Sequence, residues 1–562
     1  MKDDSLRKSV MLRLESLRQE RDKYMDEWRD SADFVIGIIP QSLMSGSGDQ
    51  SERKLRDRNE FLLNETAQWS LNVMASGMMA GVTSPARKWF ELTTPNPDLS
   101  EYGPVKEWLS EVQRIMMAVF AKSNFYQSMN GLYVDMGLYG QGVVTAYEDF
   151  DDVVSFKNIA CGNYMLGRDG RGQIDRMYCE YTMTVREAVN EFGYEALSTA
   201  HQKAYDDNEW EQIIAVVHAI EPNDNPTAGS LLAKDMPYRS VYFDKDTENH
   251  PALRESGFES KPFFAPRWFL IGEDTYSTTY PSFSAMGTNK SLQVEEMDKA
   301  VAIEKMHNPP LVGDAQLQNG GLDLIAGGVT FAPNMAAMGK PSLQAIYDVN
   351  MNVGPLLEDI AAKEIRIKEA YFADLFLMVT NMSRKQVTAT EIAERKEEKL
   401  LMLGTVLERL NNELLDPVID RVFEICMRKG LLPPPPPELQ DGMSLQVEYI
   451  SVLAQAQKAI STTSIDVTAN FVGQLASLNP DVLDKVDFDE MVDHYSKAKG
   501  TPPSIIRSTE DVGAIREQRA QAQAQAQAQQ EAVMQAQNAK LMGDTKLNGD
   551  SMLDAMIEQG SQ

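Results

Sequence analysis

Apolar residues recur every three to four positions over long parts of the chain, and this spacing predicts amphipathic helices. The first such stretch covers residues 1–39 and ends before Pro40 and a polar run rich in serine and glycine. Its apolar positions at helical spacing are Leu6, Val10, Leu14 and Leu17. The same pattern predicts further helices in the first half of the chain, over residues 56–81, 104–120 and 125–139.

Alternating apolar and polar residues predict strands, one among these helices and the others after them, up to about residue 285. Asp169-Gly170 separates two alternating runs, which is typical of a β-hairpin. Thr184 and Glu187 have the spacing of a capping box, so a short helix is expected to begin there. The expected strands are residues 89–92, 143–149, 213–220, 239–244 and 264–272. Residues 1 to about 285 are therefore predicted to form a mixed α/β unit.

Helical patterns dominate the second half of the chain. One helix is expected over residues 291–306, and Asn308-Pro309-Pro310 ends it. Its apolar residues expected on broadly one side are Leu292, Val294, Met297, Val301 and Ile303. Residues 311–341 are rich in glycine and nearly free of charge, which predicts a compact β-rich insertion buried by its neighbours. A helix resumes over about 349–371.

A long helix is expected from the capping residues Thr388 and Glu391 to Lys429. Its apolar residues keep helical spacing over many turns, at Leu400, Leu403, Leu407, Leu410, Leu414 and Val418. Gly430 and the prolines of residues 433–437 end it. A short strand over 446–450 follows, and then three helical segments, over residues 451–475, 481–499 and 508–540.

Composition excludes several classes of protein. The chain has 562 residues, with 54 Lys and Arg against 83 Asp and Glu, so its formal charge is −29. A protein that binds nucleic acid or an anionic membrane tightly needs clustered positive charge, so the net negative charge of this chain argues against both classes. Its 43% hydrophobic residues are ordinary for a globular protein. The three cysteines, Cys161, Cys179 and Cys426, are far apart and are expected to be reduced core residues.

Signatures of membrane targeting and catalysis are absent from the sequence. No uninterrupted apolar segment at the N-terminus resembles a signal peptide, and no stretch of 18 apolar residues could span a bilayer. The P-loop pattern fails at Gly339-Lys340-Pro341-Ser342, because proline displaces the hydroxyl. The five histidines are scattered, and His218 is expected to be an ordinary strand residue. We therefore expect no enzyme, no cofactor, no metal and no membrane partner.

One basic spot, Ser383-Arg384-Lys385, interrupts two helical stretches. It fits equally well a solvated helix connector or a loop that meets a polyanion, since two charges neutralise few phosphates. The acidic runs 148–152 and 484–490 lack the glycine and the spacing of a calcium loop. They are interpreted as solvated turns that keep an assembly soluble.

The order of these features resembles the portal protein, or head-to-tail connector, of short-tailed bacteriophages of the podovirus type. The segments that carry the resemblance are the helix, glycine turn and strand of residues 124–149, the hairpin of 166–178, and the capped helix with its prolines at 388–437, followed by 447–459. The resemblance runs from about residue 5 to 500. It says little about the chain after about residue 510.

The resemblance implies an α+β, mainly helical portal-protein fold that assembles as a cyclic ring. It implies a wing, two stem helices, a clip between them, a channel loop, a spine helix that returns to the wing, a crown and an Ala/Gln-rich helical extension with a tail. The expected ranges, in chain order, are 1–287 (wing), 288–306 (first stem helix), 307–348 (clip), 349–371 (second stem helix), 372–387 (channel loop), 388–450 (spine and return), 451–510 (crown) and 511–562 (extension and tail).

For function, the resemblance implies a ring at one capsid vertex through which viral DNA is packaged and ejected. The first implied partner is the chain itself, in a closed ring that is usually a dodecamer. The implied protein partners are the terminase large subunit, then the tail adaptor (head-completion) protein, and the major capsid and scaffolding proteins. The ring is also implied to contact double-stranded viral DNA without regard to sequence. The implied location is the virion, and the host cytoplasm during assembly. An acidic wall suits such a channel, because a strongly basic wall would hold the DNA.

The resemblance also assigns two sets of residues. The expected DNA-channel loop contains Met378, Asn381, Met382, Ser383, Arg384 and Lys385. The expected docking residues of the clip are Asp314, Gln316, Gln318, Asn319 and Asp323. The alternatives are a non-viral helical scaffold or adaptor protein, a phage tail-tube component, and a hydrolase with dispersed acidic residues. Closed cyclic symmetry distinguishes the ring from a monomer, a dimer or an open filament.

Overall fold

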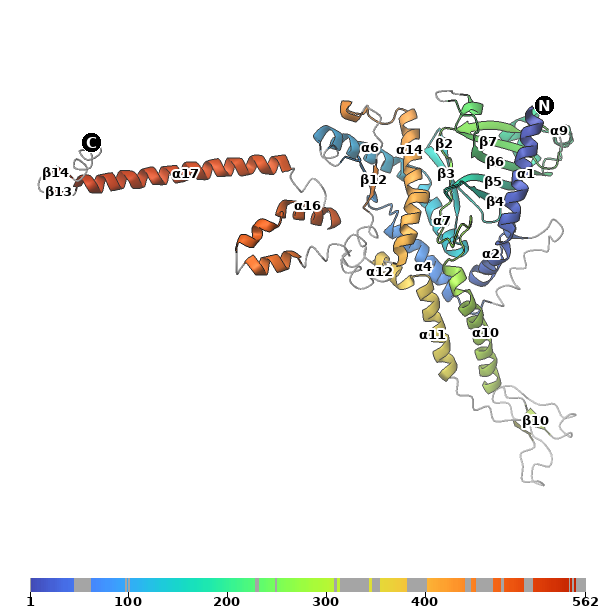
Figure 1. The fold of residues 1–562 in the computed structure, drawn as a ribbon. Helices are drawn as coiled ribbons and strands as arrows, with labels where there is room; N and C mark the ends of the chain where they lie inside the picture. Colours follow the sequence, from blue (N-terminus) through green and yellow to red (C-terminus); the bar gives the residue numbers. More distant parts are fainter. Residues whose placement is uncertain are drawn as a thin grey trace, which may run out of the picture. The chain divides into compact units, whose positions relative to one another are not determined.

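The computed structural model describes residues 2–44, 62–96, 99, 102–227, 232–247, 250–307, 311–313, 343–345, 354–381, 402–439, 446–450, 468–476, 480–499, 509–544, 546–547 and 550–551. The chain divides into two compact units, Met1–Thr463 and Ser464–Gln562. The first unit contains both larger sheets, and the second is mainly helical (Figure 1). This confirms the expected mixture of helix and sheet.

The first helices of the chain differ from the expected pattern at two points. The helix expected over 56–81 begins only at Thr66, because residues 62–65 are not helical, while residues 56–61 lie outside the described residues. Residues 1–39 were expected to form one helix, but the structure has α1 (Lys2–Asp22), α2 (Met25–Ser31) and a π-helical turn, η1 (Ala32–Ile36). The break occurs where the Tyr24 N–H donates to the Arg21 carbonyl in a tighter turn. Gly37, at φ +74°, ends the segment in the left-handed conformation that glycine adopts without strain. The next elements are η2 (Gln41–Leu43), α4 (Thr66–Gly81), α6 (Gly103–Lys122) and α7 (Phe125–Tyr139).

Five antiparallel strands form the largest sheet, in the order β4-β5-β6-β7-β8. Their bounds are Tyr164–Arg168, Ile174–Thr184, Ile213–Pro222, Tyr238–Asp244 and Arg254–Phe258. The expected hairpin at Asp169-Gly170 is confirmed, because it joins β4 to β5. The capping box of Thr184 and Glu187 is also confirmed, at the start of α8 (Val185–Phe192). The remaining short helices of this region are η3 (Tyr194–Ala196), α9 (Thr199–Asp206) and η4 (Ala233–Asp235).

Helix α1 packs on this sheet (Figure 1). Val10 and Leu14 of α1 are buried against strand residues, among them Val217 of β6. Beside them, Arg13 forms an ion pair with Glu221, whose side chain is almost fully buried. This contact closes one face of the sheet within a single chain.

A smaller sheet has the order β3-β2-β9, with β2 (Val143–Asp149), β3 (Val153–Ile159) and β9 (Phe263–Phe264). The strand expected over 264–272 is wrong beyond its first residue, apart from one isolated antiparallel bridge between Arg267 and Gln141. Side chains take the backbone hydrogen bonds that a neighbouring strand would need: the Arg267 N–H donates to Glu413 and the Phe269 N–H donates to the Ser277 hydroxyl. The segment after β9 is therefore irregular although its sequence alternates.

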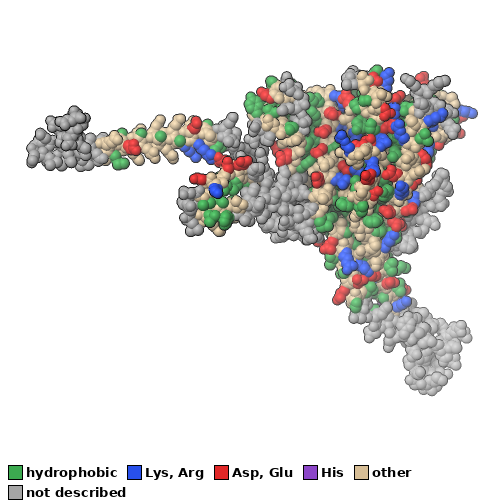
Figure 2. All heavy atoms as spheres, viewed as in Figure 1, with side chains coloured by type: hydrophobic (Ala, Val, Ile, Leu, Met, Phe, Trp, Pro, Cys, Tyr) green, Lys and Arg blue, Asp and Glu red, His purple; other side chains and the backbone are tan. Residues whose placement is uncertain are grey.

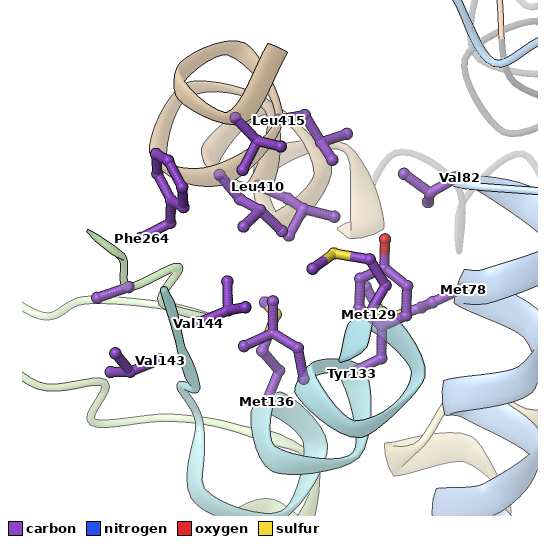
Figure 3. Packing of buried hydrophobic residues seen from close by; sticks show 14 of the residues in the cluster. Met78, Val82, Met129, Tyr133, Met136, Val143, Val144, Phe264, Leu410 and Leu415 are labelled. Carbon is purple, nitrogen blue, oxygen red and sulfur yellow. The ribbon is translucent and has the colours of Figure 1, made fainter. Parts of the chain in front are cut away.

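The predicted spine helix is confirmed in its described part, which comprises residues 402–410, the π-helical turn η6 (Asn411–Leu415) and α14 (Asp416–Arg428). Its expected apolar residues Leu403, Leu407, Leu410, Leu414 and Val418 are all buried, while Leu400 lies outside the described residues. Figure 3 shows Leu410 and Leu415 facing Val144, Phe264 and the methionines of α7. The spine therefore supplies one wall of the main core.

Two buried arginines fasten the spine to the strands. Arg267 donates from Nη2 to Glu413 of η6 at 2.6 Å. Arg421 of α14 donates from Nε to the Ala146 carbonyl at 2.8 Å and from Nη1 to the Ser260 carbonyl at 3.0 Å. Burial lowers the pKa of Arg421 to about 10, so the guanidinium remains charged at neutral pH.

Strands β1 (Phe90–Thr93) and β12 (Gln446–Tyr449) form an antiparallel pair, with Phe90 opposite Tyr449. Both were expected as short strands, but their pairing across most of the chain was not. The pair brings the end of the spine region back to the N-terminal helices. The turn before β12 includes η7 (Pro437–Leu439).

Most of the remaining elements of the first unit form a projection (Figure 1). Those that project are α10 (Pro281–His307), the strand pair β10 (Leu311–Gly313) and β11 (Leu343–Ala345), and α11 (Gly354–Ala370). The last one, α12 (Ala373–Asn381), lies in the body against α4. Helices α10 and α11 are called the stem below. The five residues expected on one side of α10 do not share a side. At 3.6 residues per turn, Val294, Met297 and Val301 lie on the side opposite Leu292 and Ile303. Leu292 is buried, whereas Val294 and Met297 are exposed. The helix has a neighbour on one face and solvent on another.

The second unit contains a helix over 468–476, η8 (Pro480–Lys485), α16 (Phe488–Lys499), α17 (Thr509–Asp544) and the short strands β13 (Lys546–Leu547) and β14 (Asp550–Ser551). The expected helices over 481–499 and 508–540 correspond to α16 and α17, while residues 451–467 of the first expected helix lie outside the described residues. Arg516 of α17 forms two hydrogen bonds with Asp489 of α16, at 2.5 and 2.8 Å. The described side chains of α17 are exposed, apart from Val512 and Ile515, which are half-buried.

Candidate subunit interface and channel segment

The two helices of the stem are joined by charged side chains. Lys363 of α11 pairs with Glu295 of α10 and, within its own helix, with Asp359 at 2.9 Å. Its Nζ also donates to the Ser291 hydroxyl at 3.0 Å. Because Lys363 and Glu295 are largely buried, the pair fixes the register of the two helices more firmly than an exposed pair would.

A short segment before α4 connects both stem helices to the body of the unit. The carboxamide oxygen of Gln293 accepts the backbone N–H groups of Leu63 and Asn64, at 2.8 and 3.0 Å. The Asn64 side chain donates to Glu296 of α10 at 3.2 Å and to Glu364 of α11 at 3.0 Å. Asn64 therefore holds the upper ends of the stem helices at a set spacing.

A buried joint links the stem to α12. The Ser282 hydroxyl donates to the Gly137 carbonyl at 2.9 Å, so the Tyr371 hydroxyl, 2.7 Å away, donates to Ser282. Phe372, between α11 and α12, has φ +53°, a conformation that is costly for a residue with a bulky side chain. The chain turns at this residue, and α12 then packs against α4.

Close packing at the next turn restrains α12. A Cβ atom at Gly77 of α4 would lie 2.3 Å from the Cβ of Phe376, so glycine is required for this approach of the two helices. Phe376 itself is fully buried. The joint therefore has one arrangement in which Tyr371, Phe372 and Phe376 are all accommodated.

The outer surface of the stem carries apolar side chains that a single chain leaves uncovered. On α10 these include Val294 and Met297, which are 60% and 59% exposed, and on α11 they include Leu357 and Ile365, at 50% and 56%. Leu357 and Ile365 are eight residues apart and lie along one ridge of the helix. Figure 2 shows hydrophobic side chains on the surface of the projecting stem. Apolar stripes of this kind on a helix are typical of an interface with another protein.

The residues expected at the channel and the clip fall at the edge of what the structure describes. Met378 and Asn381 belong to α12, whereas Met382, Ser383, Arg384 and Lys385 lie outside the described residues. The expected clip residues Asp314, Gln316, Gln318, Asn319 and Asp323 also lie outside them. The insertion is framed by β10 and β11, with Leu311 opposite Ala345. Both assignments stay predictions.

Sequence reasoning missed the polar contacts that position the stem. Asn64, Gln293, Ser282 and Tyr371 have no motif or spacing that marks them, since each acts on a residue far away in the chain. The apolar stripe of α10 was visible as a pattern, but periodicity does not tell a buried face from an exposed one. Phe372 carries no sequence signal at all.

One cluster has the residue types of a hydrolase triad, but not the geometry. Ser198, at the start of α9, lies 2.9 Å from His201 Nδ1, and Asp244 Oδ2 lies 3.1 Å from the same nitrogen. A proton relay needs the serine and the carboxylate on opposite nitrogens of the ring. The arrangement instead caps α9 and anchors it to the end of β7.

Other candidate chemistry also has structural explanations. His218 donates to or accepts from the Ser240 hydroxyl at 2.9 Å, and burial lowers its pKa to about 3, so it is a neutral strand residue as expected. The three cysteines are free and buried, which confirms that part of the prediction. Among the residues that the structure describes, no three His, Cys, Asp or Glu side chains come together as a metal site. None of the described helices is long and apolar enough to cross a membrane.

Comparison with known proteins identifies the family. The model of the bacteriophage head to tail connecting protein matches residues 7–506. The chain belongs to this family. It is 42% identical over 547 residues to the portal protein of Salmonella phage epsilon15, covering 97% of each chain, and 39% identical over 523 residues to a probable portal protein of Bordetella phage BPP-1, covering 93% of each. A chain of the virion of a native gene transfer agent particle is similar at a TM-score of 0.34 and 11% identity, over 78% of this chain and 94% of that chain, too distant to carry an argument.

Family membership confirms the resemblance and the expected portal function at the capsid vertex. It also places the chain among the components of the phage virion. The portal family therefore takes the place of two alternatives, the non-viral scaffold or adaptor protein and the hydrolase with dispersed acidic residues. A connector between head and tail is also distinct from a component of the tail tube.

Proposed function

We propose that twelve copies of this chain form a closed ring whose channel passes double-stranded viral DNA during packaging and ejection. The observation that carries the proposal is the pair of uncovered apolar stripes on the two stem helices. Because the stripes lie on different helices, α10 of one subunit would face α11 of the next. Such head-to-tail contacts between unlike surfaces close into a ring when the rotation between subunits divides a full turn.

The role of the ring is structural rather than enzymatic. A charge of −29 on each subunit gives the assembly a wall that DNA can pass without being held by counterion release. The segment after α12, with Arg384 and Lys385, would supply the few attractive groups that face the DNA. DNA contact is then weak and independent of sequence.

The partners would occupy different parts of the chain. The insertion framed by β10 and β11 would be the clip, on which the terminase large subunit docks first and the tail adaptor later. The β-rich body would be the wing, next to the major capsid and scaffolding proteins, and the second unit would form the crown and its extension. Assembly would begin in the host cytoplasm and end in the virion.

Two charges placed on the stem stripe test the ring. We expect Val294→Asp/Met297→Asp to leave the subunit folded, since both side chains are exposed, and to reduce the ring fraction at least about tenfold because carboxylates would be buried at every contact. Native mass spectrometry and electron microscopy measure the ring fraction directly. Leu12→Asp on α1 is the matched control, because Leu12 is 75% exposed but lies away from the stem.

Three results would contradict the proposal. One is a wild-type chain that stays a monomer, a dimer or an open filament under all assembly conditions. Another is normal ring formation by the stem variant. The third is an equal loss of rings in the Leu12→Asp control, which would show that added charge acts without regard to the stem.

A further inference from the structure

The turn between β2 and β3 presents one aromatic side chain to solvent. Phe150 has a relative exposure of 104%, the highest of the exposed large apolar residues in the described part of the chain. Its neighbours in the turn are acidic, namely Glu148, Asp149, Asp151 and Asp152. Glu148 pairs with Arg428 and Asp152 with Lys122, and Lys429 Nζ lies 5.9 Å from the centre of the Phe150 ring. Residues 148–152 are called the Phe150 knob below. A fully exposed phenylalanine ringed by charges is unfavourable in water and is typical of an anchor for a binding partner.

The Phe150 knob is held rigidly by two helices. Lys122 Nζ, at the end of α6, donates to the Asp151 carbonyl, and Lys429 Nζ, directly after α14, donates to the Asp149 carbonyl. Within the turn, Asp149 Oδ1 accepts the N–H groups of Asp151 and Asp152, each at 2.8 Å. The aromatic ring therefore projects from a preformed support, and a partner that binds it need not order the turn.

Backbone strain and a second turn of the same chain support a role for the knob. Val153, directly after it, has φ +71°, which is costly for a β-branched residue. The β4–β5 turn also begins with an aspartate, Asp169, whose carboxylate accepts backbone N–H groups, but it uses Gly170 and Gly172 and carries no apolar residue. The chain thus forms an unstrained turn at one hairpin and a strained one that displays Phe150 at the other. Strain of about 1–3 kcal/mol is retained where the position of a residue matters.

We propose that the Phe150 knob anchors a different protein, whose docking site is an apolar pocket edged by Lys and Arg side chains. The ring of Phe150 would fill the pocket, and the carboxylates of Asp149 and Asp151 would face the basic edge, since Glu148 and Asp152 pair with Arg428 and Lys122 of the same chain. Complementary charge around an aromatic anchor selects the partner and speeds its association. This inference concerns the β2–β3 turn and goes beyond the proposed ring.

A second copy of this chain is a poorer occupant. Each copy carries a charge of −29, so acidic turns meet mostly acidic surfaces. In the described part of the chain, a cavity of about 450 Å³ lies between the first two helices and the β3–β4 turn, but its edge mixes Arg21 and Arg29 with Asp22, Asp26 and Glu180. Such an edge would repel the carboxylates of the knob.

Photo-crosslinking of the full chain in assembling particles tests the proposal. A p-benzoylphenylalanine residue replaces Phe150, and the matched control replaces Arg171, an exposed residue of the β4–β5 turn. We expect position 150 to crosslink to one site on a different protein, flanked by Lys and Arg, at least about tenfold more than position 171, with a yield that falls as salt is raised. Crosslinks from position 150 to another copy of the chain, to an acidic or scattered set of sites, or to nothing would overturn the proposal.

A substitution distinguishes the knob from the ring itself. Phe150→Ser removes an exposed ring and leaves the turn, so rings should assemble as in the wild type while their incorporation into particles falls at least about tenfold. Phe150→Trp should keep incorporation near the wild-type level. Normal incorporation with Phe150→Ser would overturn the anchor, and so would loss of the rings themselves. Ring counts by electron microscopy on the same samples test the proposed function separately.

Discussion

The β4–β8 sheet and the stem differ in the burial of their apolar side chains: the sheet buries them within one chain, whereas the stem leaves many exposed. Helix α1 covers the sheet with Val10 and Leu14, and burial of Glu221 is offset by hydrogen bonds from Tyr178, Arg239 and Arg13, which lower its pKa. The sheet region thus completes its core within one chain. In the stem, polar side chains such as Lys363 and Glu295 pair inside the subunit, while apolar side chains such as Val294 and Met297 face outward. The difference separates what a subunit needs to fold from what it needs in order to assemble.

The largest predicted effect compares one apolar truncation in each region. Phe243→Ala removes a buried ring of β7 that packs in one cluster with Val10 and Leu14 of α1, and we expect it to lower the free energy of unfolding by about 3–5 kcal/mol. Met297→Ala in the stem should lower it by less than about 0.5 kcal/mol in the separate subunit, yet weaken the ring. Urea unfolding of subunits at low concentration, alongside native mass spectrometry, measures both. Equal destabilisation by the two substitutions would remove the distinction between the regions.

A half-buried carboxyl group on α7 predicts that the stability of the subunit depends on pH. Burial raises the pKa of Asp135 on α7 to about 7. Between about pH 4 and pH 7 the folded chain therefore binds a proton that the unfolded chain releases, so stability falls as pH rises through this range and stays lower above it. Asp135→Asn should flatten this part of the profile and stabilise the subunit at pH 8 by about 1–3 kcal/mol. Thermal unfolding of the wild type and of Asp135→Asn at a series of pH values measures this dependence. Identical stability profiles for the two proteins would show that ionisation of Asp135 does not destabilise the folded subunit.

The smallest predicted effect concerns the charges inside the stem. Lys363→Met removes the ion pair with Glu295 and leaves that carboxylate largely buried, so we expect a loss of about 1–2 kcal/mol that high salt reduces only in part. Lys299→Met is the matched control, because the pair of Lys299 with Glu296 lies within α10 and joins no second helix. Urea unfolding in low and high salt compares them. A larger loss from Lys299→Met would mean that pairing between the two helices is unimportant for the stem.

Local chemistry made much of the fold predictable. The bounds of α7, the Asp169-Gly170 hairpin and the capping box of Thr184 depend on residues close together in sequence, and all three are confirmed. Contacts between distant residues were not predictable in the same way. The expected strand over 264–272 failed because Glu413 and the Ser277 hydroxyl accept its backbone N–H groups.

The candidate interface was predictable as a location but not in its detail. A helix with Val294 and Met297 was expected, yet hydrophobic spacing could not show that these two side chains face solvent while Leu292 is buried. Asn64 and Tyr371 position the stem through single hydrogen bonds to residues far along the chain. The strained turn at Phe150 was interpreted as a solvated acidic run, because sequence gives the charges but not the direction of the ring.

The pairing of β1 with β12 also cannot form until late in the synthesis of the chain. Thr93 and Gln446 are 353 residues apart, so the ribosome must add about that many residues after β1 before its partner exists. At roughly 5–20 residues per second, the edge of β1 waits roughly 20–70 s. During that time the nascent chain contains the stem but has not closed its body, and an unpaired strand edge is open to the wrong partner. Subunits that meet before β12 has been synthesised would therefore be incomplete.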